Sequence, residues 1–162
     1  MSVLVAAVLA ASGCASIPKP DSASDTILVV QVNASSSSAY KGSEYFMRMY
    51  GIPDRIKLSV GYNYIHLSSA GPQTITEIFA QARSQPANHY YTFSSINKII
   101  ILEEGAINVL RPIINFQVTS VKNSYHMDAK LGGISDAQLE QIKQNLSSME
   151  NFKLWPKLTV IE

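Results

Sequence analysis

Few side chains in this sequence could carry out catalysis or hold a metal ion, and they are widely spaced. The histidines are His66, His89 and His126, and no two of them have the short spacing of a helical or ribbon metal site. Glu103 and Glu104 are adjacent in a turn-forming stretch, so their carboxylates would form a poor acid–base pair. The nucleophile-elbow, zincin and P-loop motifs are missing from the sequence. We therefore expect no metal, no other cofactor and no catalytic residues, and we interpret the chain as a non-enzyme.

Tyrosines are the more promising binding groups. Aromatic residues are frequent between positions 40 and 64: Tyr40, Tyr45, Phe46, Tyr50, Tyr62 and Tyr64. If residues 62–67 form a strand, Tyr62, Tyr64 and His66 share one face of it, because alternate strand residues point the same way. On an exposed face such rings could stack on sugar rings or contact a protein partner. These three residues are the candidate binding site; the alternative is half-buried tyrosines at a sheet edge, with their hydroxyls in water.

The single cysteine, Cys14, follows a run of small apolar residues. Val3 to Ala11 contains only Val, Leu and Ala, and is far shorter than the roughly 20 residues of a membrane-spanning helix. A short apolar run followed by Ser12 and Gly13 is typical of a secretory signal. The stretch resembles the lipobox of bacterial lipoproteins, in which the cysteine thiol carries diacylglycerol and the signal is removed before the cysteine. Ala11 stands where that family most often has Leu, and no Lys or Arg precedes the run.

The lipobox resemblance implies how the chain is divided and where it resides. Residues 1–13 would be the signal peptide, and the lipid on Cys14 would anchor the mature chain to a membrane. No Asp follows Cys14 directly, which by this resemblance implies the outer membrane, with the protein facing the periplasm. Residues 14–25 end in IPKPDSASD, a composition that indicates a flexible tether. The alternative is a buried N-terminal helix with a cysteine in the core.

The length of the chain indicates the number of domains, and its charge bears on whether nucleic acid is a partner. Residues 26–162 have the size of one domain, which can bury a core without a disulfide. The 13 Lys and Arg and the 12 Asp and Glu give a net charge of +1, with no basic stretch. We therefore do not expect a nucleic-acid partner.

Most of residues 26–162 show the pattern of short strands. Thr26–Val32 and Lys98–Leu102 are apolar runs typical of buried strands, and Arg55–Val60 alternates between polar and apolar residues. Gln73–Ala82 favours a strand, and Ile107–Val121 one or two strands, with Pro112 at an edge or a bulge. Gly- and Pro-containing breaks separate these runs about every 8–12 residues, as in β-sandwiches and barrels.

One helix is predicted near residues 136–149. Ser135 and Gln138 have the spacing of a capping box. Apolar residues then recur at helical spacing on one face: Leu139, Ile142, Leu146 and Met149. We therefore expect a mainly β fold, an antiparallel β-sandwich of transthyretin-like or immunoglobulin-like type, with one C-terminal α-helix.

The order of turns and strands also resembles a known group of proteins. The stretch GIPDRIKLSVGYNYIHLSSAGPQTIT, followed later by INKIIILEEGAINVLRP, is similar to small uncharacterised lipoproteins with a PEGA-like, transthyretin-like β-sandwich. Gly71-Pro72 reverses the usual Pro-Gly order of that family, and Ala106, Ile107 and Asn108 replace its basic and aromatic residues. The resemblance covers about residues 26–150. It supplies no catalytic residues and implies a binding or structural role at a cell surface.

These observations favour a non-catalytic, lipid-anchored envelope protein that binds another envelope protein or cell-wall glycan. One alternative is an envelope hydrolase, in which distant strands bring a histidine close to a nucleophile. A second alternative is a carrier of apolar ligands with an interior cavity lined by apolar side chains. An edge strand of the sandwich could also pair with a second copy of the chain.

Overall fold

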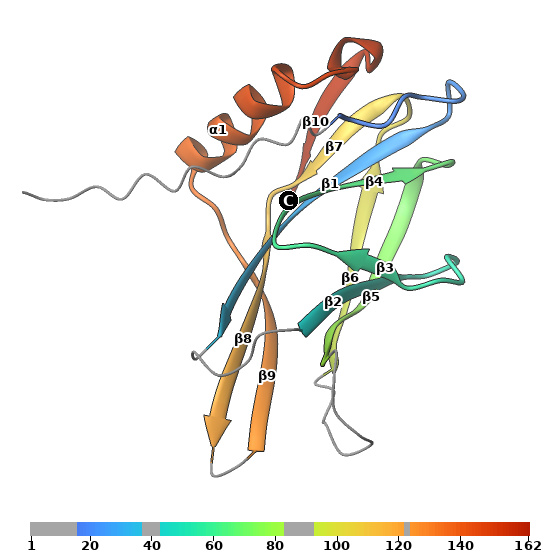
Figure 1. Ribbon diagram of the computed structural model, residues 1–162. Coiled ribbons are helices and arrows are strands. Elements are labelled where there is room, and N and C mark those ends of the chain that lie inside the picture. Colours follow the sequence, from blue (N-terminus) through green and yellow to red (C-terminus); the bar gives the residue numbers. More distant parts are fainter. Residues whose placement is uncertain (1–15, 37–42, 83–92, 122–123) are drawn as a thin grey trace, which may run out of the picture.

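The computed structural model describes residues 16–36, 43–82, 93–121 and 124–162. Its strands are β1 (Thr26–Ser36), β2 (Ser43–Met49), β3 (Ile56–Leu58), β4 (Gly61–Leu67), β5 (Gly71–Ala82), β6 (Phe93–Leu102), β7 (Ala106–Leu110), β8 (Ile113–Val121), β9 (Ser124–Gly132) and β10 (Lys157–Ile161). Its helices are α1 (Asp136–Ser147) and the short 3-10 helix η1 (Phe152–Leu154). Figure 1 shows two sheets facing each other, with α1 packed outside one of them. The prediction of a mainly β fold with one C-terminal α-helix is confirmed.

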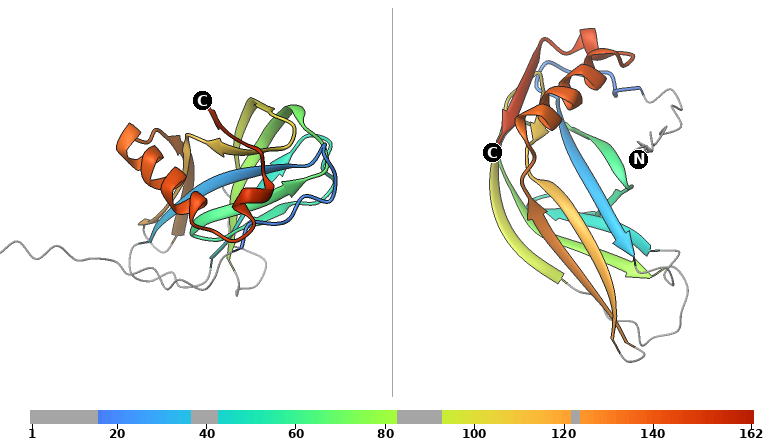
Figure 2. Two further views of the ribbon diagram at one scale, coloured as in Figure 1. Left: turned by 90° about the horizontal axis from the view of Figure 1, so that it is seen from above. Right: turned by 90° about the vertical axis from the view of Figure 1, so that its left-hand side faces the viewer.

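The larger sheet has the order β10-β7-β1-β8-β9, and β4 pairs with the other side of β1. Only Arg111 and Pro112 separate β7 from β8 along the chain. β1 pairs in parallel with both strands, through its first residues with β7 and through its last residues with β8. The sheet curls into a half-barrel, as the right-hand view of Figure 2 shows. Its strands are therefore partly parallel, whereas the sequence analysis predicted an antiparallel sandwich.

The parallel pairs follow from the connections between strands, because the chain leaves the larger sheet after β1, forms the smaller sheet and β4, and then returns. Parallel neighbours need a long crossover connection, and strands β2 to β6 supply one between β1 and β7. β8, β9 and α1 supply another between β7 and β10, which are also parallel. Strand patterns in the sequence do not fix these directions, and the expected antiparallel arrangement is therefore wrong for the pairs β1–β7, β1–β8 and β7–β10.

The smaller sheet has the order β3-β2-β5-β6 and is antiparallel throughout. Its inner face meets the larger sheet across one apolar cluster, which includes Leu28 and Val30 from β1 and Met47, Ile78 and Ile100 from the smaller sheet. All five side chains are almost completely buried. The two sheets therefore share one core.

Helix α1 covers the outer face of the larger sheet. Ser135 caps it: its hydroxyl accepts a hydrogen bond from the Gln138 amide, and the Gln138 side chain accepts one from the Ser135 amide. The buried side of the helix consists of Leu139, Ile142 and Leu146, which join a second apolar cluster with side chains of β1 and β7. The capping box and the apolar face of Leu139, Ile142 and Leu146 are confirmed. The helix ends at Ser147, so Met149, which was predicted to lie on that face, comes after the helix and packs partly buried against the same cluster. No helix among the described residues combines the length and hydrophobicity needed to cross a membrane.

The segment that precedes β1 is packed against the domain from Ile17 onward. The Ile17 side chain is 0% exposed and belongs to the second apolar cluster. Its amide donates to the Glu150 carbonyl at 3.2 Å, and its carbonyl accepts from the Asn151 side chain at 2.9 Å. The Trp155 indole donates to the Pro18 carbonyl at 2.9 Å.

The prediction of a flexible tether is therefore wrong for Ile17 to Asp25. The Pro, Ser and Asp content is typical of a tether, but burial of Ile17 supplies the free energy for docking. The signal peptide predicted at residues 1–13, and Cys14 itself, lie outside the described residues.

Candidate functional site

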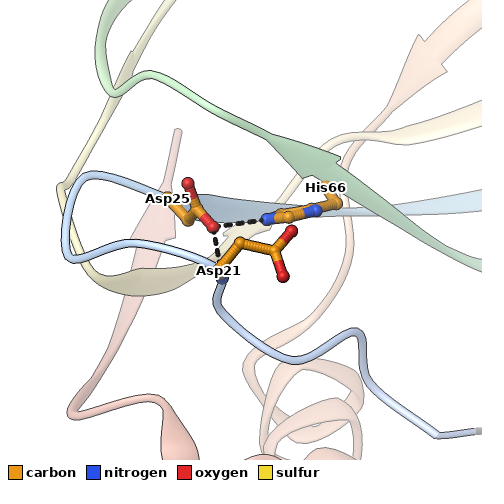
Figure 3. A group of neighbouring side chains, drawn as sticks. All are labelled: Asp21, Asp25 and His66. Carbon is orange, nitrogen blue, oxygen red and sulfur yellow. Dashed lines mark hydrogen bonds and ion pairs between the residues drawn. The ribbon is translucent and has the colours of Figure 1, made fainter.

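A group of three potential metal-ligating side chains lies where the N-terminal segment meets β4. Asp21 and Asp25 come from the turn before β1, and His66 comes from the end of β4 (Figure 3). One ligand atom of each residue lies within 4.8 Å of the others. The His66 Nε2 atom lies 3.0 Å from Oδ2 of Asp25. Residues 41 positions apart therefore meet at one end of the two sheets.

Asp25 organises this group. Its side chain is 4% exposed. Its Oδ2 atom accepts hydrogen bonds from the amides of Asp21 at 2.6 Å and Ser22 at 3.0 Å, and its Oδ1 atom accepts one from the Ser22 hydroxyl at 2.6 Å. The Ser22 hydroxyl bond is the main cause that holds the pKa of Asp25 well below its usual range; burial opposes it, and the two amides and His66 add to it. Asp25 is therefore a carboxylate at neutral pH.

The hydrogen bonds of Asp25 fix the turn that precedes β1. In a nucleophile–histidine–carboxylate site the hydroxyl must face the histidine. Here the Ser22 hydroxyl donates to Asp25 instead. The oxygens of Asp25 that could bind a cation already accept bonds from two amides, the hydroxyl and His66. The Asp25–His66 pair therefore joins the N-terminal segment to β4.

The lowered pKa of Asp25 predicts a specific dependence of stability on pH. Because the folded pKa lies below the unfolded value of about 3.9, the ionised form stabilises the fold above that pH, and this contribution is lost as pH falls further. We expect the wild-type free energy of unfolding to decrease more between neutral pH and about pH 3 than that of Asp25→Asn. Urea denaturation at both pH values measures this difference.

The control for the pH experiment is Asp54→Asn, which changes an exposed carboxylate elsewhere on the surface. This variant should show the wild-type pH dependence. Equal pH dependence in Asp25→Asn and wild type would show that Asp25 does not couple folding to protonation.

The structure places the three predicted binding residues on one face of β4, as the alternation indicated. Tyr62, Tyr64 and His66 pair with Gln31, Val29 and Ile27 of β1. That face is turned toward the second apolar cluster, against which both tyrosine rings pack. Burial raises the pKa of both tyrosines. The rings are thus half-buried and only His66 is exposed, so the three residues form no open aromatic surface.

The other residues considered for chemistry are not brought to the Asp25–His66 pair by any described contact. His89 lies outside the described residues, and for His126 only the backbone in β9 is described. Glu103 binds Lys157 and Thr159 of β10, each at 2.6 Å, and these hydrogen bonds, that of Lys157 first, lower its pKa. Glu103 therefore connects the turn after β6 to β10.

Sequence reasoning missed the pairing of Asp25 with His66. Pro, Ser and Asp before a strand do signal a turn, and an Asp at the end of such a turn commonly binds nearby backbone amides. The local half of the site could therefore have been predicted. The partner on β4 could not, because it depends on the strand order.

Open cavities lie around the turns at this end of the sheets. One of about 310 Å³ is lined by residues of the N-terminal segment and by Leu154, Trp155 and Pro156. Another of about 750 Å³ lies between the turns at residues 69–71 and 101–104. Both are recesses lined by turn residues, unlike the interior cavity expected of a carrier of apolar ligands.

Comparison with known proteins adds no relative: no protein-family model matches the chain, and neither curated proteins nor solved structures give a significant match.

Proposed function

We propose that this chain is a lipid-anchored protein of the bacterial cell envelope that acts as a non-catalytic binding or structural module. The lipobox resemblance around Cys14 supports the anchor. The main structural support is the docking of Ile17, which is completely buried only three positions after Cys14. This docking would hold the domain close to an anchored Cys14. The hydrogen bonding of Ser22 to Asp25 rather than to His66 supports a non-catalytic role.

Docking of Ile17 sets how the anchored domain would be held. Three residues of extended chain span at most about 11 Å, so lipid on Cys14 would leave little free linker. The region where Ile17 binds Glu150 and Asn151, in the turn after α1, would then lie close to the lipid headgroups. A domain held in this way is suited to contacting partners near the membrane surface.

The proposal includes the outer membrane as location, with the domain in the periplasm. Its partners would be another envelope protein or cell-wall glycan. Two sheets enclosing one shared core also support a relation to the transthyretin-like β-sandwich lipoproteins, although the parallel pairs of the larger sheet depart from an antiparallel sandwich.

Intact mass spectrometry of the full chain, extracted from bacterial membranes, tests the anchor. We expect a mass that corresponds to loss of residues 1–13 and addition of acyl chains. The Cys14→Ser variant should lack the acyl mass and leave the membrane fraction, because the hydroxyl cannot replace the thiol in lipidation. Unmodified full-length wild-type protein would contradict the proposal.

A further inference from the structure

We infer that a recess beside Tyr50, between the turns that follow β2 and β4, binds a neutral sugar of about disaccharide size. This inference names a ligand class for the proposed binding module and so rests on the proposed function. The recess has a volume of about 520 Å³. That volume falls within the range of about 300–1,000 Å³ typical of small-molecule sites.

Tyr50 is the most exposed large apolar or aromatic side chain among the described residues, at 78%. Its backbone is nevertheless fixed. The Tyr50 amide donates to the Thr74 carbonyl at 2.8 Å, and the Ile52 amide donates to the Met49 carbonyl at 3.2 Å across the turn. Gly51 adopts φ +80°, which closes this turn. An exposed ring on a fixed turn offers a stacking surface that loses little conformational entropy on binding.

The turn between β4 and β5 and the beginning of β5 supply the polar lining of the recess. Ser68 and Ser69 of the turn and Gln73 at the beginning of β5 line it, and no hydrogen bond to another described residue engages their side chains. Pairing of Gly71 with Leu102 and of Pro72 with Ile101 holds the beginning of β5 in place. The recess therefore presents two hydroxyls and one amide from a rigid backbone.

The apolar part of the recess is supplied by Ile52 and Leu67, which line it and pack against the core between the sheets. None of the described residues that line the recess carries a charge. A ligand that matches this surface needs hydroxyl groups for the polar wall, C–H groups for the Tyr50 ring and the apolar side chains, and no net charge. A pyranose ring has all three properties.

The chemistry of the recess thus differs from that of the two other cavities around the turns. The recess of about 750 Å³ includes Glu103 and Glu104, and that of about 310 Å³ includes Asp21. The exposed ring of Tyr50 also differs from the rings of Tyr62 and Tyr64, which pack against the second apolar cluster. Among the tyrosines whose side chains the structure describes, Tyr50 is the one exposed enough to stack on a sugar.

The test is titration calorimetry of the detergent-extracted full chain with N,N′-diacetylchitobiose, cellobiose and maltose, all of them neutral, supported by saturation-transfer NMR. We expect at least one disaccharide to bind with a Kd on the order of 1 mM. Tyr50→Ala should weaken this binding about tenfold, since it removes the stacking ring. Tyr50→Phe should retain the affinity, because stacking needs the ring and not the hydroxyl.

Two further variants separate the recess from general surface effects. Gln73→Ala should weaken binding several-fold, by removing one hydrogen-bonding group while leaving the ring. Leu154→Ala truncates an apolar side chain that is 50% exposed but lies outside the recess. This variant should leave binding unchanged. Thermal unfolding of each variant confirms that it is folded.

Absence of binding to all three disaccharides, or binding that Tyr50→Ala does not weaken, would overturn the inference. Binding of a proline-rich peptide in place of the sugars, lost in Tyr50→Ala, would overturn it in favour of a protein partner. The mass measurement keeps the two proposals distinct. Lipidated protein without sugar binding rejects the recess alone, and sugar binding by protein unmodified at Cys14 rejects the anchor alone.

Discussion

Replacing Ile17 with Ala should lower the free energy of unfolding by about 2–5 kcal/mol, the usual cost of truncating a buried large aliphatic side chain. Ile17 is 0% exposed and belongs to the apolar cluster beneath α1. Truncation would leave a cavity beside the hydrogen bonds that Ile17 makes with Glu150 and Asn151. The expected effect is large for a residue so close to the beginning of the described chain.

The measurement is urea denaturation followed by the fluorescence of Trp155, the single tryptophan of the sequence. Trp155 is 4% exposed, and its indole donates to the Pro18 carbonyl, so it reports directly on the docked segment. Far-UV circular dichroism of the same samples reports on the sheets. An earlier fluorescence transition in Ile17→Ala would show that the segment opens before the rest unfolds.

The matched control is Lys19→Ala, which changes an exposed side chain two positions further along the same segment. We expect this variant to stay within about 0.5 kcal/mol of wild type. Equal stability of wild type and Ile17→Ala would mean that residues 17–25 are a tether after all, and it would remove the argument that the domain is held close to the lipid.

Features that depend on neighbouring residues were predictable from the sequence. The capping box of Ser135 and Gln138 and the spacing of Leu139 and Ile142 are local signals, and α1 begins where they indicate. Pro112 lies between β7 and β8 as expected, because proline cannot donate a ladder hydrogen bond.

Features that depend on which strands become neighbours were not predictable. The alternation in β4 correctly indicated that Tyr62, Tyr64 and His66 share a face. It could not indicate that this face lies against the apolar cluster beneath α1, because that depends on the curled sheet. The Asp25–His66 pair was missed for the same reason. Tyr50 was noted only as one aromatic residue among several, and its exposure follows from the turn at Gly51.

Loss of Asn108 should disturb the contact between β1 and the turn that joins β6 to β7. It is 0% exposed, in a strand in which every residue is buried. Its Oδ1 atom accepts from the Glu103 amide at 2.9 Å, and its Nδ2 atom donates to the Thr26 hydroxyl at 2.6 Å. The Thr26 hydroxyl lies 3.0 Å from each of the carbonyls of Glu103 and Ala106. Asn108 thus joins β1 to the turn between β6 and β7.

Asn108→Leu should therefore lower the free energy of unfolding by about 2–4 kcal/mol, because the Glu103 amide and the Thr26 hydroxyl would lose a partner away from water. Thr26→Val keeps the shape of the side chain and should cost about 1–2 kcal/mol. The double variant should cost less than the sum, since removing both polar partners leaves fewer unsatisfied groups than removing one. Urea denaturation of the four proteins measures this coupling, and strict additivity would show that the two side chains do not act as one network.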